Sequence, residues 1–151
     1  MTVPPTRVEQ EAVECDSVFI PTDGSAAADV AVSHTMAIAD HFGATVHVLY
    51  VIRSGRGLPS SSDSERAKAE EVVGSVAEKA DQREVDVKTH VQAGSPHDRI
   101  RSFISEHGID LVTMGTYGRS GVKRYLLGSV TEKVLRTSEA PVITARLTNS
   151  D

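Results

Sequence analysis

The chain has 151 residues, of which 39% are hydrophobic and 25% are charged. This length and balance predict one soluble globular domain that is long enough to form a core. The net charge of −5 argues against nucleic acid or an anionic membrane as the main partner, because both require a basic protein face.

Residues 1–14 are polar and acidic and contain two prolines, which predicts a disordered tail before a single domain at 15–151. The tail has no apolar segment of the kind found in secretory signals, and no apolar run reaches the length of a membrane span. The single cysteine, Cys15, cannot form an intrachain disulfide, which fits a reducing compartment. We therefore expect a cytoplasmic protein.

The first predicted unit is a strand and a helix. Residues 17–23 form a short apolar run that Pro21 stops, as in a central parallel strand. A helix is expected from Gly24 and Ser25 to the natural C-cap Gly43. Its buried stripe is predicted at Ala28, Ala31, Val32, Thr35, Ala39 and Phe42. Asp23 has two interpretations, either a helix cap worth about 1 kcal/mol or a contact to a ligand above the strand end.

The middle of the chain predicts two strands and a helix. Residues 44–52 are apolar almost throughout and rich in β-branched residues, so this strand is expected to be buried on both faces. The polar segment 53–64 predicts a linker, with a loose lid over the site as the alternative. A helix from Glu65 has Ala69, Val72, Val73, Val76 and Ala80 at helical spacing. Residues 85–91 alternate between apolar and polar, which predicts a strand at a sheet edge.

The last third predicts two helices and two strands. Ser95, Pro96 and Asp98 have the pattern of an N-cap, a first-turn proline and the acid of a capping box. A second capping-box pattern, Ser129 and Glu132, opens the final helix. Residues 109–114 and 142–145 are apolar and predict the fourth and fifth strands. The expected buried helix positions are Ile100, Phe103 and Ile104, and then Val130, Val134 and Leu135.

A glycine-rich loop joins the fourth strand to the final helix. Residues 114–129 read Met-Gly-Thr-Tyr-Gly-Arg-Ser-Gly-Val-Lys-Arg-Tyr-Leu-Leu-Gly-Ser. A strand, a glycine-rich loop and a helix N-terminus together favour an anion such as phosphate, because unpaired amides and the helix dipole face it. The Walker and Gly-x-Gly-x-x-Gly motifs are absent. The spacing is instead Gly-x2-Gly-x9-Gly-Ser, formed by Gly115, Gly118, Gly128 and Ser129.

Five strands that alternate with four helices predict an α/β fold with an open parallel sheet, strand order 3-2-1-4-5 and helices on both faces. In this order the topological switch lies between strands 1 and 4. Ligands of open α/β sheets bind at the carboxyl ends of strands at such a switch. The two loops that meet there are residues 22–25 and the glycine-rich loop.

Several motifs resemble the ATP-binding branch of the universal stress protein family, over roughly residues 16–147. They are Pro-Thr-Asp-Gly-Ser at 21–25, Leu-Tyr-Val at 49–51, Gly-Ser-Pro-His at 94–97, Met-Gly-Thr-Tyr-Gly at 114–118 and Leu-Leu-Gly-Ser-Val-Thr at 126–131. The resemblance implies a Rossmann-like, adenine nucleotide alpha hydrolase-like fold. It also implies an ATP-binding regulator or stress-response switch rather than an enzyme. Tyr50 departs from the family pattern, in which many members have His.

The resemblance further implies a set of binding residues. These are Pro21, Thr22, Asp23, Val51, Met114, Gly115, Gly118, Arg119, Gly128, Ser129, Val130 and Thr131. Asp23 is expected to share a Mg or Mn ion with the nucleotide phosphates, and the backbone of Val51 is expected to contact adenine. The family also implies a homodimer through residues 142–145, an apolar sheet edge that a second copy could pair with.

Two alternative functions remain open at this point. One is a slow ATPase or nucleotidyl-transfer enzyme, although no nucleophile motif or base near a γ-phosphate is evident. The other is a nucleotide-free dimerisation module. The six histidines are scattered along the sequence without a zinc-ligand pattern. The sequence does not decide between ATP, AMP and a cyclic nucleotide, and the protein partner is unknown.

Overall fold

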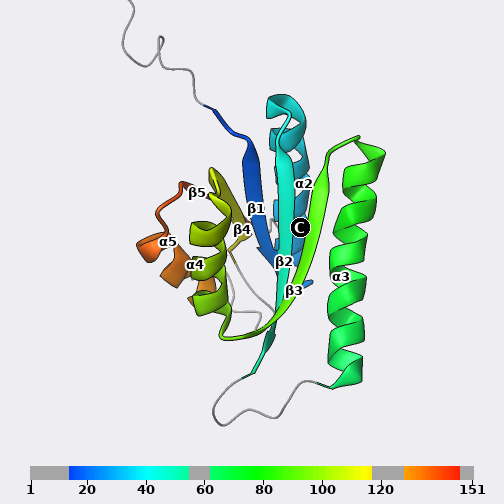
Figure 1. The fold of residues 1–151 in the computed structure, drawn as a ribbon, viewed down its shortest axis with the longest axis vertical. Helices are drawn as coiled ribbons and strands as arrows, with labels where there is room; N and C mark the ends of the chain where they lie inside the picture. The colour runs from blue at the N-terminus through cyan, green and yellow to red at the C-terminus, as the bar shows by residue number, and fades with distance from the viewer. Residues whose placement is uncertain (1–13, 55–61, 117–127, 147–151) are drawn as a thin grey trace, which may run out of the picture.

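A computed structural model of the chain describes residues 14–54, 62–116 and 128–146 (Figure 1). Strands and helices alternate throughout this part of the chain. The elements are β1 (Ser17–Thr22), α2 (Ala26–Phe42), β2 (Thr45–Arg53), α3 (Asp63–Gln82), β3 (Val87–Gly94), α4 (Pro96–His107), β4 (Leu111–Gly115), α5 (Ser129–Thr137) and β5 (Val142–Ala145). The predicted α/β class is confirmed. The predicted tail falls on residues outside the described part, except for Glu14.

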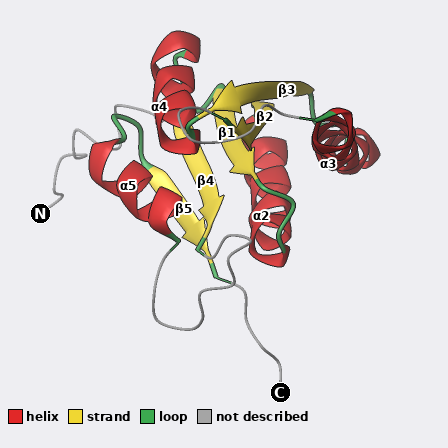
Figure 2. Cartoon of the chain, turned by 90° about the horizontal axis from the view of Figure 1, so that it is seen from below, coloured by secondary structure: helices red, strands yellow, loops and turns green. Residues whose placement is uncertain are grey.

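The five strands form one parallel sheet in the order β3-β2-β1-β4-β5, as predicted. β1 is central and pairs with β2 on one side and β4 on the other. Helices α2 and α3 cover one face of the sheet, and α4 and α5 cover the other (Figure 2). The topological switch therefore lies where the chain leaves β1 and β4 toward opposite faces.

Alternate residues of each strand point to opposite faces, so the sheet has two cores. Under α2 and α3 lies the larger one, here called the α2–α3 core. Its members include Val18, Ile20, Val32, Met36, Val46, Val48, Val73 and Val76. Under α4 and α5 lies the α4–α5 core. It contains Phe19, Leu49, Ile100, Phe103, Ile104, Ile109, Val112, Met114 and Val134.

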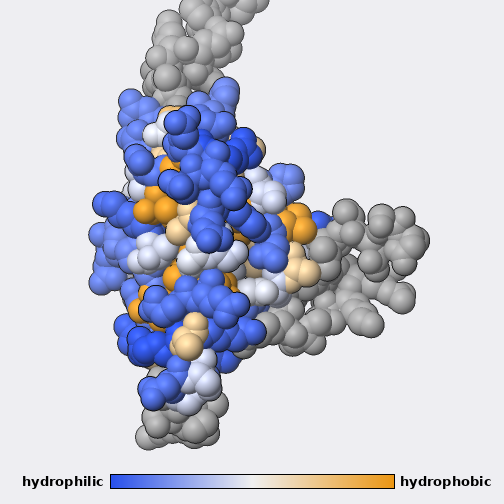
Figure 3. All heavy atoms as spheres, turned by 90° about the vertical axis from the view of Figure 1, so that its right-hand side faces the viewer, coloured by the Kyte–Doolittle hydropathy of each residue, from blue (hydrophilic) through white to orange (hydrophobic). Residues whose placement is uncertain are grey.

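The sequence of helix α3 has the spacing of buried residues that is typical of an amphipathic helix. Only Ala69, Val73, Val76 and Ala80 are fully buried, at intervals of three and four residues. The outer surface over α3 is mainly hydrophilic (Figure 3). Among the described residues, no helix is long and apolar enough to cross a membrane.

Two predicted core positions are wrong. Phe42 is 45% exposed, because it is the last residue of α2, where the chain turns at Gly43, and its ring packs edge-on against His41. Met36, which was not among the predicted positions, is fully buried. Leu135 is 39% exposed, because the buried side of the short helix α5 consists only of Thr131 and Val134.

Both predicted capping boxes are also wrong. Ser95 is the N-cap of α4, but its side chain makes no capping hydrogen bond. The N-cap of α5 is Gly128, so Ser129 is already the first helical residue and cannot cap. A complete capping box forms instead at α3, where Ser62 Oγ accepts from the amide of Glu65 and the Glu65 carboxylate accepts from the amide of Ser62.

Candidate functional site

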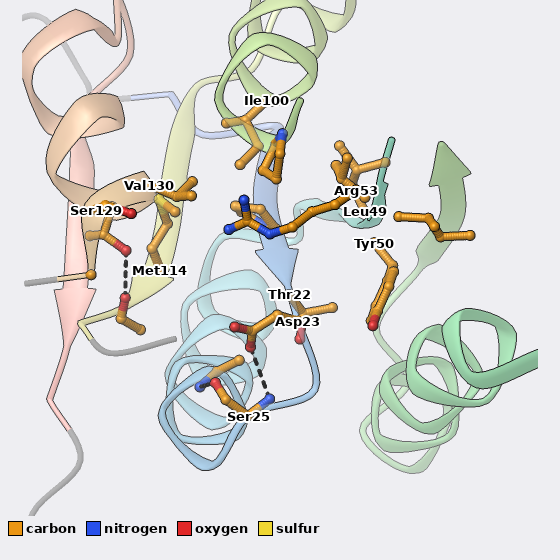
Figure 4. Close-up of a pocket in the computed structure, with 18 of the residues that line it drawn as sticks. Thr22, Asp23, Ser25, Leu49, Tyr50, Arg53, Ile100, Met114, Ser129 and Val130 are labelled. Carbon is orange, nitrogen blue, oxygen red and sulfur yellow. Dashed lines mark hydrogen bonds between the residues drawn. The ribbon is translucent and has the colours of Figure 1, made fainter. Parts of the chain in front are cut away.

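A cavity of about 560 Å³ opens at the carboxyl ends of β1, β2 and β4, at the topological switch (Figure 4). Loops and helix ends from both faces of the sheet contribute to its wall. The lining residues are Pro21, Thr22, Asp23, Ser25, Ala28, Leu49, Tyr50, Val51, Ile52, Arg53, Glu65, Lys68, Pro96, Ile100, Met114, Gly115, Gly128, Ser129, Val130 and Thr131. Its position is the one expected for a ligand site in an open α/β sheet.

The structure brings most of the predicted binding residues together. Of the twelve, ten fall in the described part of the chain, and all ten line this cavity. They come from the ends of β1, β2 and β4 and from the first turn of α5. Gly118 and Arg119 lie outside the described residues. That these residues bind a nucleotide stays a prediction.

The turn between β1 and α2 fixes the position of Asp23. The amide of Ser25 donates to Asp23 Oδ1 over 2.9 Å, and Ser25 Oγ accepts from the amide of Ala28 over 3.2 Å. Ser25 is therefore the N-cap of α2, and the helix-cap interpretation of Asp23 is wrong. Gly24 has φ +78°, a left-handed conformation that favours glycine. The half-buried Asp23 carboxylate is thus held at the cavity wall (Figure 4).

Gly115, at the end of β4, has a packing role that the sequence analysis missed. A Cβ at this position would lie 2.6 Å from the backbone carbon and oxygen of Ala27 in α2. Only glycine lets β4 and α2 approach so closely. Thr131 Oγ1 donates to the carbonyl of Gly115 over 2.9 Å, and the amide of Gly128 donates to the carbonyl of Thr116. These bonds join the start of α5 to the end of β4.

The cavity has an apolar wall and a polar wall. Leu49, Ile100, Met114 and Val130 provide the apolar surface. The N-terminal turns of α2 and α5, whose amide ends carry partial positive charge, also border the cavity. The N-cap of α5, Gly128, has no side chain that could make a capping hydrogen bond. This arrangement suits a ligand with a flat apolar part and an anionic part.

Several lining residues carry no signal that the sequence analysis used. Arg53 reaches into the cavity from the end of β2 (Figure 4), and Lys68 and Glu65 reach it from α3. The sequence analysis had placed Arg53 in a linker, had named Glu65 only as the start of a helix, and had not considered Lys68. Pro96 and Ile100 line it from α4, although Ile100 was expected only as a core residue. Only the tertiary structure shows that these residues line the cavity.

The charged groups of the lining fit a cation that arrives with a ligand rather than one held by protein alone. Asp23 and Glu65 are the carboxylates of this lining. In the part of the chain that the structure describes, no group of three His, Cys, Asp or Glu side chains is placed to hold a metal ion. A Mg ion prefers six oxygen ligands, so one or two carboxylates would leave most positions to phosphate and water.

Comparison with known proteins agrees with this fold. The model of the universal stress protein family matches residues 15–146. Universal stress protein MJ0531 of Methanocaldococcus jannaschii is 33% identical over 137 residues, which cover 85% of this chain and 81% of that protein. The solved structure of MJ0577, from the same organism, superimposes with a TM-score of 0.79 and 29% identity. That match covers 91% of this chain and all of the other.

A further solved structure is a universal stress protein in complex with cAMP. It has a TM-score of 0.70 and 23% identity, and it covers 88% of this chain and 98% of that one. At this identity the likeness concerns the fold. The extent of the family match and the identity to MJ0531 together show that the chain belongs to the universal stress protein family.

Proposed function

We propose that the chain binds an adenine nucleotide, ATP in the first instance, in the cavity at the topological switch. The observation that carries this proposal is the convergence of the 22–25 turn and the start of α5 on one cavity with an apolar wall and two helix N-termini. The cAMP complex of a protein with this fold supports an adenine nucleotide as the ligand class. By alternating between a nucleotide-bound and an empty state, the protein would then act as a nucleotide-dependent regulator or stress-response switch.

The lining suggests how such a ligand would lie. The adenine ring would pack against Leu49 and Ile100, near the backbone of Val51, because these residues form the apolar wall. The phosphates would face Gly128 and Ser129 at the N-terminus of α5. Asp23 would share a Mg or Mn ion with the phosphates. Phosphate oxygens and water molecules would together provide the remaining ligands of the ion.

Glycine substitutions test this placement. Replacing Gly118 or Gly128 with Val would put a side chain where phosphate is expected, so calorimetric affinity for ATP should fall at least about tenfold, or about 1.4 kcal/mol. Gly74→Val is the matched control, because Gly74 lies in α3, outside the cavity lining, with no atom within 4 Å of an added Cβ. Circular dichroism checks that each variant folds. Unchanged affinity in both loop variants would refute the placement.

We propose that this binding serves regulation rather than catalysis. Efficient phosphoryl transfer requires a positioned water or base and charge stabilisation at the γ-phosphate. Of the two carboxylates in the described lining, that of Asp23 would hold the cation, and that of Glu65 accepts from the amide of Ser62 in the capping box. Hydrolysis should therefore be slow or absent. A turnover above about one per second, as in ordinary enzymes, would show that a catalytic group has been missed.

We also propose a homodimer through β5. This strand lies at the edge of the sheet, and Ile143 on it is 42% exposed. Pairing with the same strand of a second copy would satisfy the backbone of both by two-fold symmetry. Ile143→Lys should give a folded monomer in light scattering, whereas Phe42→Lys, at an equally exposed site on α2, should not. A wild-type monomer at micromolar concentration would refute the dimer.

A further inference from the structure

Three histidines that are far apart in the sequence meet under helix α4. His47 comes from β2, His90 from β3 and His107 from the last turn of α4. Their ring centroids form a nearly equilateral triangle with separations of 5.4, 5.4 and 5.5 Å. The sequence analysis had treated the histidines as scattered.

Hydrogen bonds and stacking place each ring of this histidine cluster. Nδ1 of His47 and Nε2 of His90 are 3.2 Å apart, so one ring donates a proton and the other accepts it. Nδ1 of His107 is 3.2 Å from the carbonyl oxygen of Phe103, to which it donates. The Phe103 ring stacks on His107 at 3.8 Å and meets His47 and His90 edge-on. Through Phe103 and His107, helix α4 packs directly on His47 and His90 of the two strands.

Nothing in the cluster compensates a positive charge. His47 is only 8% exposed, and burial, followed by His90, His107 and Lys88, lowers its pKa to about 4. Burial, with His107 and Lys88, also lowers the pKa of His90. The groups that face the cluster are thus His47 from β2, Lys88 and His90 from β3, and His107 from α4. In the described part of the chain, no carboxylate is among the groups that shift either pKa.

The same helix forms part of the cavity wall. Phe103 of α4 contacts the cluster and His107 belongs to it, while Pro96 and Ile100, nearer the start of the helix, line the cavity. Leu49 follows His47 by two residues on β2, points to the same face and also lines the cavity. Leu49, Ile100 and Phe103 belong to one continuous core. A displacement of α4 would therefore alter the cluster and the cavity together.

We propose that the cluster of His47, His90 and His107 is a proton-sensitive contact that seats α4 on the sheet at neutral pH and releases it in acid, which weakens ligand binding in the cavity. The part that concerns the ligand rests on the proposed nucleotide site. An imidazolium is a donor at both nitrogens, so the His47–His90 bond loses its acceptor when both rings are charged. A charge on His47, which is buried beneath Phe103, becomes fully hydrated when α4 moves away.

Linkage makes this coupling reciprocal. If a ligand binds only while α4 is seated, acid lowers the affinity for the ligand, and the ligand opposes protonation of His47 and His90 by the same free energy. Adding nucleotide should therefore move the NMR titration midpoints of these two imidazoles to lower pH. The NMR signals of His34, exposed on α2, should not respond to added nucleotide and serve as an internal reference.

The experiment compares the double variant His47→Gln/His90→Gln with the control His34→Gln/His41→Gln, which changes two exposed histidines of α2. Hydrogen exchange of the α4 amides is measured without nucleotide at pH 7.5 and 5.0, and ATP affinity is measured by calorimetry at both values. Protonation of ATP itself affects all variants equally, so it cancels in the comparison. If the double variant does not fold, His90→Gln, at the less buried site, replaces it.

In the wild type and the control, the opening equilibrium of α4 should rise about tenfold from pH 7.5 to 5.0, and ATP affinity should fall at least about threefold. Beyond the loss of affinity that protonation of ATP causes in every variant, the double variant should change less than about twofold in both. An α4 opening equilibrium that does not respond to pH, or that responds equally in the double variant, would overturn the proposal. Absence of ATP binding at pH 7.5 would refute the nucleotide site and the ligand part, and the exchange data would still decide the α4 contact.

Discussion

The two faces of the sheet differ in the chemistry of their side chains. The α2–α3 core is built almost entirely of Val, Ile, Ala and Met, with one pair of buried threonine hydroxyls, Thr35 and Thr113. The α4–α5 core holds the stacked rings of Phe19 and Phe103, with the histidine cluster at one end and the cavity at the other. The proposals above therefore assign stabilisation of the fold mainly to the α2–α3 core, and the coupling of α4 to ligand and protons to the α4–α5 core.

Large-to-small substitutions in the two cores give the largest effects. Phe103→Ala and Met36→Ala each remove a fully buried side chain and should lower the free energy of unfolding by about 3–5 and about 2–5 kcal/mol, respectively. Urea unfolding measures both. Only Phe103→Ala should also weaken ATP binding, because it loosens α4. An equal loss of ATP affinity in folded Met36→Ala would contradict the division between the faces.

The next prediction concerns the close approach of β4 to α2 at Gly115. This contact lies between the cavity lining and the α2–α3 core. Gly115→Ala places a Cβ 2.6 Å from the backbone of Ala27. This overpacking should lower the free energy of unfolding by about 1–3 kcal/mol. The control Gly74→Ala has open space and should stabilise helix α3 by up to about 1 kcal/mol. A Gly115→Ala protein as stable as the wild type would show that the strand and helix can separate freely.

Acid should weaken the fold through the α4–α5 face. The pKa of His47 is about 4 in the folded chain, below the ordinary 6.5, so the unfolded chain binds more protons between these values. The contribution of His47 to the free energy of unfolding is therefore fully present above pH 6.5 and falls as the pH drops toward 4. Its size should be about 2 kcal/mol, allowing for partial solvation of the ring.

A urea series from pH 7 to pH 4 measures this slope. His47→Gln should flatten the curve, whereas His41→Gln, at an exposed site on α2, should leave it unchanged. The same pH dependence in His47→Gln and the wild type would assign the acid sensitivity to other groups.

The smallest expected effect concerns the polar pair on the α2–α3 side. Thr35 Oγ1 lies 2.6 Å from Thr113 Oγ1 and also donates to the carbonyl of Ala31 over 2.7 Å. Thr113→Val should therefore lower the free energy of unfolding by only about 1 kcal/mol. Urea unfolding at pH 5 and pH 7 should show the same loss. A loss that depends on pH would mean that the two faces are not independent.

The strand order and the cavity were predictable because they follow from local patterns. Apolar runs mark the buried strands, the alternating run at 85–91 marks the edge strand, and right-handed crossovers then leave few topologies. The two loops at the switch follow from that order. The binding residues themselves came from the resemblance to the universal stress protein family, and the ten that are described lie on one cavity.

Features that depend on exact packing were not predictable. Ser62 and Ser129 are both followed three residues later by Glu, but only Ser62 sits at the N-cap and forms the box. The histidine cluster depends on the register of β2 with β3, in which Leu49 is paired with His90 and His47 lies diagonally across the same face. The approach of Gly115 to Ala27 depends on how α2 sits on β4.

Native mass spectrometry of the chain tests the central claim most directly. The protein is measured as purified and after addition of saturating ATP with Mg, beside Gly128→Val and the control Gly74→Val. We predict one adenine nucleotide per chain in the wild type and in the control, and none in Gly128→Val. A wild-type chain that retains no adenine nucleotide under either condition would contradict the assignment of the cavity at the topological switch.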